Sequence, residues 1–292
     1  MNDNIWGIRS RRKFESQVRK EFSSMFNEPS TEKFIGNTIN DLGGGYIESC
    51  ENALLNGHTN LRSSDVWYHF NELGTRGDWK IDSDVEINIG YFGCSFTFGE
   101  GVDEDEIFPN LISQNILPSN QAINMGYRGG DISRTVRYFN YVSEFIDLSV
   151  AVFTLPTWYR VEYIHEKSHS LFDINSLILN VKSDEPLENI KKAYYTYNND
   201  NMLKYSLLQK LEHIYNVCQL KGIVPLFTSW DGELYYFISE YLNDINLLPQ
   251  YRFIENEKDG MYFACDGHHP GLITHKRYAD EILNHIDKYD LI

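Results

Sequence analysis

Short apolar runs alternate with amphipathic segments along the chain from residue 86 onward. The runs are rich in β-branched and aromatic residues and are bounded by glycine, proline or polar residues, which is typical of buried strands; they cover residues 87–92, 122–123, 149–155 and 223–227. Between and after them, apolar side chains recur at helical spacing over residues 106–117, 131–142, 203–220 and 278–286. Alternating strands and helices predict a three-layer α/β/α fold with a mainly parallel sheet.

Three parts of this pattern carry specific expectations. Either Asp131 or Ser133 caps the second helix, since both side chains accept hydrogen bonds from backbone N–H groups. Pro225 lies inside the last apolar run, and because proline donates no ladder hydrogen bond we expect it at the start of the strand or at a bulge. Residues 156–186 show no clear period. They follow a strand end, where open α/β sheets bind ligands, so we expect a wall or lid there.

Residues 1–85 follow a different pattern, which predicts an irregular N-terminal extension to a larger domain over residues 86–292. Residues 9–26 are basic and carry an apolar stripe at helical spacing, formed by Phe14, Val18, Phe22, Met25 and Phe26. This stripe either packs against its own domain or docks on a protein partner. Residues 27–64 are rich in Asn, Gly and Ser and predict a loop with one short helix near residues 47–55.

The composition allows a large globular unit and argues against some classes of binding partner. The chain has 292 residues, of which 42% are hydrophobic, and this is enough to bury a sizeable core. Its 42 acidic residues exceed the 26 basic ones and give a net charge of −16. Nucleic acids and anionic membranes attract basic surfaces, so we expect neither as a partner. The N-terminus has no apolar stretch long enough for a signal peptide, so we expect a cytoplasmic protein or one carried on a virus particle.

The cysteines and histidines give no clear metal-binding pattern. Four cysteines are spread along the chain without CxxC spacing: Cys50, Cys94, Cys218 and Cys265. We expect free thiols, with a Cys94–Cys265 disulfide as the alternative. His165 and His169 have the i, i+4 spacing of a metal pair on a helix, but no obvious acidic ligand accompanies them, and surface histidines are favoured. We therefore expect no metal and no organic cofactor.

The segment Gly93-Cys94-Ser95-Phe96-Thr97-Phe98-Gly99 follows the first apolar run directly. A serine between a strand and a helix has an exposed hydroxyl, and the helix N-terminus offers backbone N–H groups to a developing oxyanion. These are the requirements of a nucleophile in acyl transfer. The alternative is an ordinary Gly/Ser loop that joins the two elements.

A second segment with candidate catalytic residues is Asp266-Gly267-His268-His269-Pro270-Gly271, just before the last helix. A serine hydroxyl needs a base to take its proton, and a carboxylate fixes the tautomer of that base. A single turn presents an imidazole and a carboxylate three residues apart, so Asp266 and His269 fit these two roles. The alternative is a capped turn that stops at Pro270.

Together the two segments resemble the SGNH (GDSL-type) hydrolase family. Its first block reads GDS-x-T-x-G and its last block DxxH, and here they stand as residues 93–99 and 266–271. Its second block, an Asn before a Gly-rich turn, resembles residues 124–131, and a weaker N-x-LG-x-R-G likeness covers residues 71–77. The three blocks occur in the order of the family. The resemblance implies a flavodoxin-like SGNH hydrolase fold over residues 86–292.

The resemblance also implies roles for individual residues. Ser95 matches the nucleophile, His269 the general base and Asp266 the residue that orients it. The backbone N–H groups of Ser95 and Gly129 match the oxyanion hole. Two alternatives stay open: Gly126 for the oxyanion glycine and His268 for the base.

The chain departs from the family at two places. Cys94 stands where the family has Asp, and it fits there as a small packing residue, with a cysteine nucleophile as a weaker alternative. The family's third block, G-x-N-D, is missing: the third apolar run is followed by Pro156-Thr157-Trp158-Tyr159-Arg160. Thr157 or Arg160 is a candidate for the missing oxyanion donor, and losing such a donor costs about a hundredfold in turnover.

The leading functional prediction is a serine esterase that works through an acyl-enzyme without a cofactor. The resemblance and the aromatic residues favour removal of O-acetyl groups from a carbohydrate, with Trp158, Arg160 and Trp230 as candidate substrate-binding residues. The main alternative is a weakly active or inactive protein of this fold that serves in a virus particle or surface assembly. A metal-dependent hydrolase that uses His165, His169 and His268 is the third hypothesis.

Overall fold

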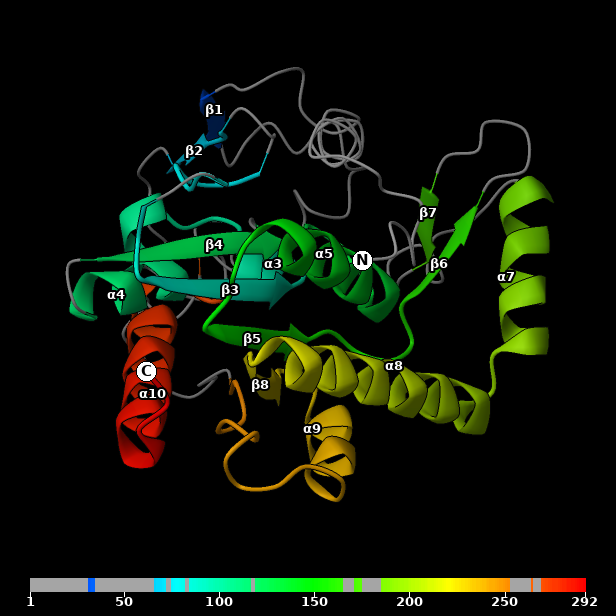
Figure 1. Ribbon diagram of the computed structural model, residues 1–292. Coiled ribbons are helices and arrows are strands. Elements are labelled where there is room, and N and C mark those ends of the chain that lie inside the picture. Colours follow the sequence, from blue (N-terminus) through cyan, green and yellow to red (C-terminus); the bar gives the residue numbers. More distant parts are fainter. Residues whose placement is uncertain are drawn as a thin grey trace.

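A four-stranded parallel sheet forms the centre of the protein. The computed structural model describes residues 31–34, 66–71, 75–81, 84–116, 119–164, 171–174, 185–252, 264 and 269–292. The sheet order is β4-β3-β5-β8, formed by β3 (Ile87–Gly93), β4 (Asn120–Gly126), β5 (Val150–Leu155) and β8 (Val224–Ser229). All three neighbouring pairs are parallel, and β3, β4 and β5 point the same way in Figure 1. The predicted parallel sheet is confirmed.

Helices cover both faces of this sheet, as the alternating pattern predicts. On one face, α5 (Ile132–Phe145), α8 (Asp200–Lys221) and α9 (Gly232–Ser239) bury side chains against alternate residues of the strands, including Phe92 and Phe153. On the other face, α4 (Phe108–Asn115) and α10 (Leu272–Tyr289) pack against Tyr91 and Val152. The side chains of a strand point alternately to its two faces, so each strand contributes to both cores. Among the described helices, none combines the length and apolar content needed to cross a bilayer.

Capping residues explain where the helices begin. Asp131 caps α5, because its carboxylate accepts a 2.8 Å hydrogen bond from the Arg134 N–H, and this decides between the two caps that the sequence offers. Asn199 caps α8 in the same way, so that helix starts three residues before the expected residue 203. The first predicted helix is shorter than expected. A 3₁₀ turn, η2 (Glu104–Glu106), precedes α4.

Pro225 occupies the second position of β8, and β8 is the edge strand of the sheet. Two residues later, the Phe227 N–H points away from β5 and donates to Asn246 O at 2.8 Å. Backbone N–H groups two residues apart point the same way, so the nitrogen of Pro225 also faces away from β5. The missing N–H of the proline therefore removes no hydrogen bond between β8 and β5. The proline therefore lies near the strand start, as expected, and the edge position is the physical reason.

The segment at residues 156–186, which the sequence leaves without a period, contains a small hairpin. β6 (Val161–Ile164) and β7 (Leu171–Ile174) pair antiparallel, and α7 (Glu185–Tyr197) follows. The Tyr194 hydroxyl of α7 donates to the carbonyl of Tyr159 at 2.7 Å. The expected role as a wall or lid stays a prediction.

Part of the predicted N-terminal extension packs against the larger domain. β1 (Thr31–Phe34) pairs antiparallel with β2 (Val66–His69), so a strand lies where the sequence predicts loop. Val66, Tyr68 and Phe70 form a buried cluster with Phe98, which lies just after Ser95. The predicted helices at residues 9–26 and near 47–55 lie outside the described residues, so the choice between a packing and a docking role for the first stays a prediction.

Candidate active site

Ser95 stands at the carboxyl end of the central strand β3, where the chain turns into the one-turn helix α3 (Ser95–Phe98). The turn needs Gly93, because a Cβ there would lie 2.6 Å from the Thr154 carbonyl oxygen. Gly99 ends the helix in the left-handed conformation, with φ 81°. As the first helical residue, Ser95 has a backbone N–H without an acceptor inside the helix.

His269 reaches this serine from the other end of the sequence. Its Nε2 lies 2.9 Å from the Ser95 Oγ, although the two residues are 174 positions apart. Both side chains are buried. The backbone of His269 is fixed by a 2.8 Å hydrogen bond from the Ala264 N–H to its carbonyl, and the Phe96 ring contacts its imidazole edge-on. The structure thus brings together the two residues that the sequence motifs separate most widely.

The other residues of the DxxH segment are not described. Asp266, Cys265 and His268 lie outside the described residues, and so do His165 and His169. The orienting role of Asp266 stays a prediction, and so does the interpretation of His165 and His169 as surface histidines. Within the described residues, no group of three or more His, Cys, Asp or Glu side chains could hold a metal ion. Cys94 and Cys218 are buried free thiols.

Glu100 and Arg128 also belong to this site, and neither is among the residues that the motifs predict for it. The Glu100 Oε2 lies 3.4 Å from His269 Nε2, and its Oε1 accepts a 2.9 Å hydrogen bond from the Arg128 Nε and pairs with a terminal nitrogen of the same guanidinium at 2.9 Å. The only sequence signal for Glu100 is its place directly after Gly99. Arg128 likewise stands directly before Gly129, but only the folded chain brings the two turns together.

Gly129 and Gly126 compete for the role of oxyanion donor, and their hydrogen bonds differ. The Gly126 N–H donates to the Asn124 side chain at 2.9 Å, so it is already used. Within the described part of the chain, no group accepts the Gly129 N–H, and Gly129 adopts a left-handed φ of 74° in a partly buried turn. Gly126 has a packing role, because a Cβ there would lie 2.2 Å from the Phe98 N. These contacts favour Gly129.

The turn after β5 holds the candidate third donor. Thr157 is partly buried, and its hydroxyl accepts a long 3.4 Å hydrogen bond from the Tyr159 N–H. Pro156 has no N–H to offer. The sequence-predicted donor Thr157 therefore stays a prediction.

The three candidate substrate-binding residues fall into two environments. Trp230 stacks on Phe96 with ring centroids 5.0 Å apart, and the Arg160 guanidinium lies over the Trp230 ring at 5.5 Å. Because Phe96 follows Ser95 directly, its ring links Trp230 and Arg160 to the nucleophile turn. Trp158, by contrast, is buried against Phe237 in the core.

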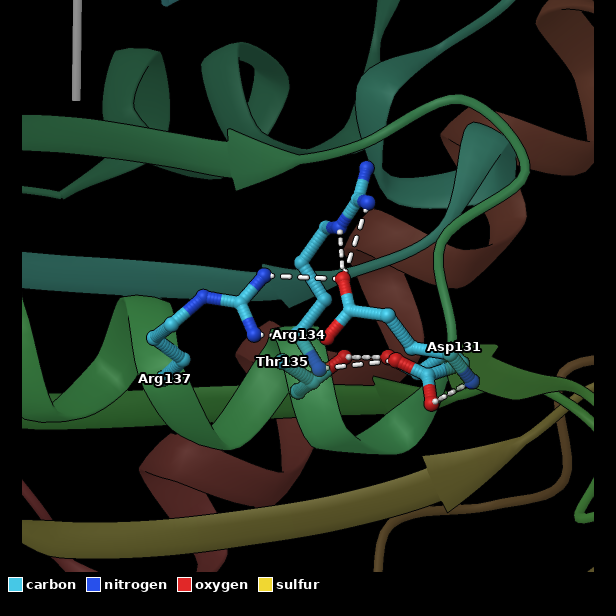
Figure 2. Close-up of polar contacts among 5 residues, drawn as sticks. Asp131, Arg134, Thr135 and Arg137 are labelled. Carbon is cyan, nitrogen blue, oxygen red and sulfur yellow. Dashed lines mark hydrogen bonds and ion pairs between the residues drawn. The ribbon is translucent and has the colours of Figure 1, made fainter. Parts of the chain in front are cut away.

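A buried ionic cluster ties the β6–β7 hairpin to the turn that follows Gly129 (Figure 2). Arg134 and Arg137 of α5 both donate to the Glu162 carboxylate, at 2.6–3.1 Å. The Glu162 N–H donates to Asp131, which also caps α5. Burial alone would raise the pKa of Glu162, but hydrogen bonds and charges from Arg137 and Arg134 outweigh it and lower the pKa. The Arg160 guanidinium completes the link by donating to the Gly130 carbonyl at 3.3 Å.

Arg76 holds the turn on the other side of Ser95. Its buried guanidinium donates to the carbonyls of Phe98, Gly99 and Val102 at 2.6–2.7 Å. Burial lowers the pKa of Arg76. Arg76 is the arginine of the N-x-LG-x-R-G segment, so that likeness reflects support of the nucleophile turn through backbone carbonyls.

Comparisons with known proteins give a fold likeness at low identity. No family model and no curated protein matches the chain. Among solved structures, TesA is 12% identical, with a TM-score of 0.45 over 70% of this chain and 99% of TesA. The esterase EstA from Pseudoalteromonas sp. is 13% identical, with a TM-score of 0.44 over 70% of this chain and 98% of EstA. A GDSL-like lipase from Bacteroides thetaiotaomicron is 12% identical, with a TM-score of 0.43 over 69% of this chain and 88% of the lipase.

Proposed function

We propose that the protein is a serine esterase that hydrolyses an ester through an acyl-enzyme. The observation that carries this proposal is the 2.9 Å contact between Ser95 Oγ and His269 Nε2 at the carboxyl end of the central strand. A nucleophile and a base within hydrogen-bond reach are the geometric requirement for activating a serine hydroxyl.

In the proposed reaction, Ser95 Oγ attacks the ester carbonyl while its proton moves to His269 Nε2. The backbone N–H groups of Ser95 and Gly129 stabilise the oxyanion, with Thr157 as the candidate third donor. His269 passes the proton to the departing alcohol and then activates water to release the acid. Asp266, three residues before His269, is proposed to orient the imidazole.

Removal of O-acetyl groups from a carbohydrate is the proposed substrate class. The support is local: the buried Phe96 ring beside Ser95 stacks on the partly buried Trp230, and the Arg160 guanidinium lies over Trp230. Ligand sites commonly combine aromatic walls with a few polar groups in this way. The N-x-LG-x-R-G likeness adds no support for this substrate class, because Arg76 donates to the backbone carbonyls of the nucleophile turn.

The direct test is labelling with a fluorophosphonate, followed by hydrolysis of p-nitrophenyl acetate. We expect a covalent adduct on Ser95 that is lost in Ser95→Ala and His269→Gln, with hydrolysis at least about a thousandfold slower in each. The matched control is Ser239→Ala, which changes a partly buried serine of α9 whose hydroxyl donates to the Tyr236 carbonyl of the same helix. Acetate release from acetylated polysaccharides, compared with long-chain esters, tests the substrate class.

An assembly protein with little or no activity remains the second candidate. One observation favours it: the turn after β5 begins with Pro156, which has no N–H, and the next four residues contain no asparagine. A folded chain that neither labels nor hydrolyses acetate esters would favour this candidate over the esterase.

A further inference from the structure

A second oxygen faces the nitrogen of His269 that contacts the nucleophile. Glu100 follows the one-turn helix of Ser95, and its Oε2 lies 3.4 Å from His269 Nε2. The side chains of His269 and Glu100 are only 10% and 7% exposed. The Nε2 atom therefore meets the Ser95 hydroxyl and the Glu100 carboxylate at the same time, in a place where water screens the charge poorly.

Arg128 fixes the direction of this carboxylate. Its Nε and one terminal nitrogen both lie 2.9 Å from the Glu100 Oε1. The other oxygen, Oε2, is the one turned toward His269. Arg128 stands directly before Gly129, so one carboxylate joins the proposed oxyanion turn, the nucleophile turn and the histidine.

The contact has opposite effects before and after proton transfer. Before transfer, the lone pair of Nε2 accepts the Ser95 hydroxyl proton, and a carboxylate oxygen at 3.4 Å repels that lone pair. After transfer, Nε2 carries a proton and the ring a positive charge, which the same oxygen attracts. An interaction that strengthens as charge develops lowers the barrier of the chemical step.

We propose that Glu100 is a catalytic carboxylate that stabilises the imidazolium of His269 from the Nε2 side, and that the positive charge of Arg128 weakens this stabilisation. The proposal rests on the esterase function given above. As the bond from Ser95 Oγ to the acyl carbon forms, the hydroxyl proton moves to Nε2 and the carbonyl electron pair moves to its oxygen. The proton leaves Nε2 for the alcohol oxygen as the ester C–O bond breaks. Glu100 keeps its charge throughout and bonds to no substrate atom.

Other charged groups around His269 also affect how readily its imidazole takes up a proton. His275 of α10 interacts electrostatically with His269, and Arg76 with His275. Burial, followed by these two charges, lowers the pKa of His275 to about 3, so it stays neutral when the pH is between 5 and 9. Asp266 is present in every variant below. Glu100 and Arg128 are therefore the described charges that the experiment changes.

The test is the rate of fluorophosphonate labelling of Ser95 in the full chain, from pH 5 to pH 9. We expect Glu100→Gln to move the midpoint of the acid limb down by about one unit and to lower the plateau rate about tenfold, because the base becomes weaker. We expect Arg128→Gln to move the midpoint up, since it leaves the Glu100 charge unopposed. Glu144→Gln is the matched control, because that carboxylate pairs with Lys221 on the surface.

The outcomes separate this inference from the proposed function. Labelling of the unmodified chain together with unmoved midpoints in Glu100→Gln and Arg128→Gln would overturn the role of Glu100 and leave the esterase standing. If circular dichroism shows that Glu100→Gln does not fold, Arg128→Gln decides alone, and an unmoved or lowered midpoint overturns the proposal. An unmodified chain that never labels ends both proposals. A purely structural role for Glu100 would lower the rate equally at every pH.

Discussion

Replacing Arg76 by methionine tests whether the nucleophile turn depends on a residue outside the central sheet. The substitution keeps an unbranched apolar stem and removes three hydrogen bonds to the carbonyls of Phe98, Gly99 and Val102. Arg76 is 1% exposed, so water cannot take over these carbonyls without a rearrangement of the turn.

The expected loss follows from these three contacts. A hydrogen bond to a charged group contributes about 1.5–3 kcal/mol net, so three at the low end sum to about 4.5 kcal/mol. The variant no longer has to bury a charge, which offsets part of this loss. We therefore expect Arg76→Met to lower the free energy of unfolding by about 3 kcal/mol.

Urea unfolding followed by circular dichroism measures this loss. With an m-value of about 3 kcal/mol/M, the midpoint falls by about 1 M. The control Arg252→Met removes an exposed arginine that bonds to Gln250, and it should change stability by less than about 0.5 kcal/mol. A midpoint for Arg76→Met within about 0.2 M of the unmodified chain would refute the reasoning.

Two further substitutions probe the supports of the site. Gly126→Ala places a Cβ 2.2 Å from the Phe98 N, so we expect urea unfolding to show a loss of about 1–3 kcal/mol in stability and Ser95 to label more slowly. The control is Gly232→Ala, whose Cβ would lie 3.4 Å from its nearest atom. Equal stability of the two variants would contradict the packing argument. Burial lowers the pKa of His275 to about 3, so the unfolded chain binds a proton more readily below pH 6.5 and stability is lost as the pH falls toward 3. Replacing His275 by Asn should flatten this part of the stability–pH curve in urea unfolding at several pH values, and an unchanged slope would show that other groups cause it.

The sequence predicted the sheet well because strands and helices have different periods. The buried runs at β3, β5 and β8 stand out, since both faces of each strand are covered and apolar residues follow one another. The hairpin of β6 and β7 gave no such signal. Each of its strands has four residues and pairs mainly with the other, so no long apolar run marks them.

The candidate site could be predicted only where a local motif carries the chemistry. Ser95 and His269 each stand at a glycine-punctuated strand or helix boundary, and the parallel topology brings such boundaries to one edge of the sheet. Glu100 and Arg128 meet through the side-by-side packing of two turns. That pairing depends on side-chain direction in the folded chain, which no spacing in the sequence records.

The turns of the site are held by side chains that do not react, and this separates two kinds of variant. Asn124 shows the principle: its amide donates to the Thr97 carbonyl at 3.1 Å and its oxygen accepts the Gly126 N–H, so it joins the nucleophile helix to the end of β4. Arg76 does the same for the turn after Ser95. Loss of such a support moves reacting atoms and unpairs buried groups together, so stability and labelling should fall in parallel at every pH. Loss of Glu100 instead removes a charge next to the atom that gains a proton, so the Glu100 variant should be recognised by a shifted pH profile of labelling.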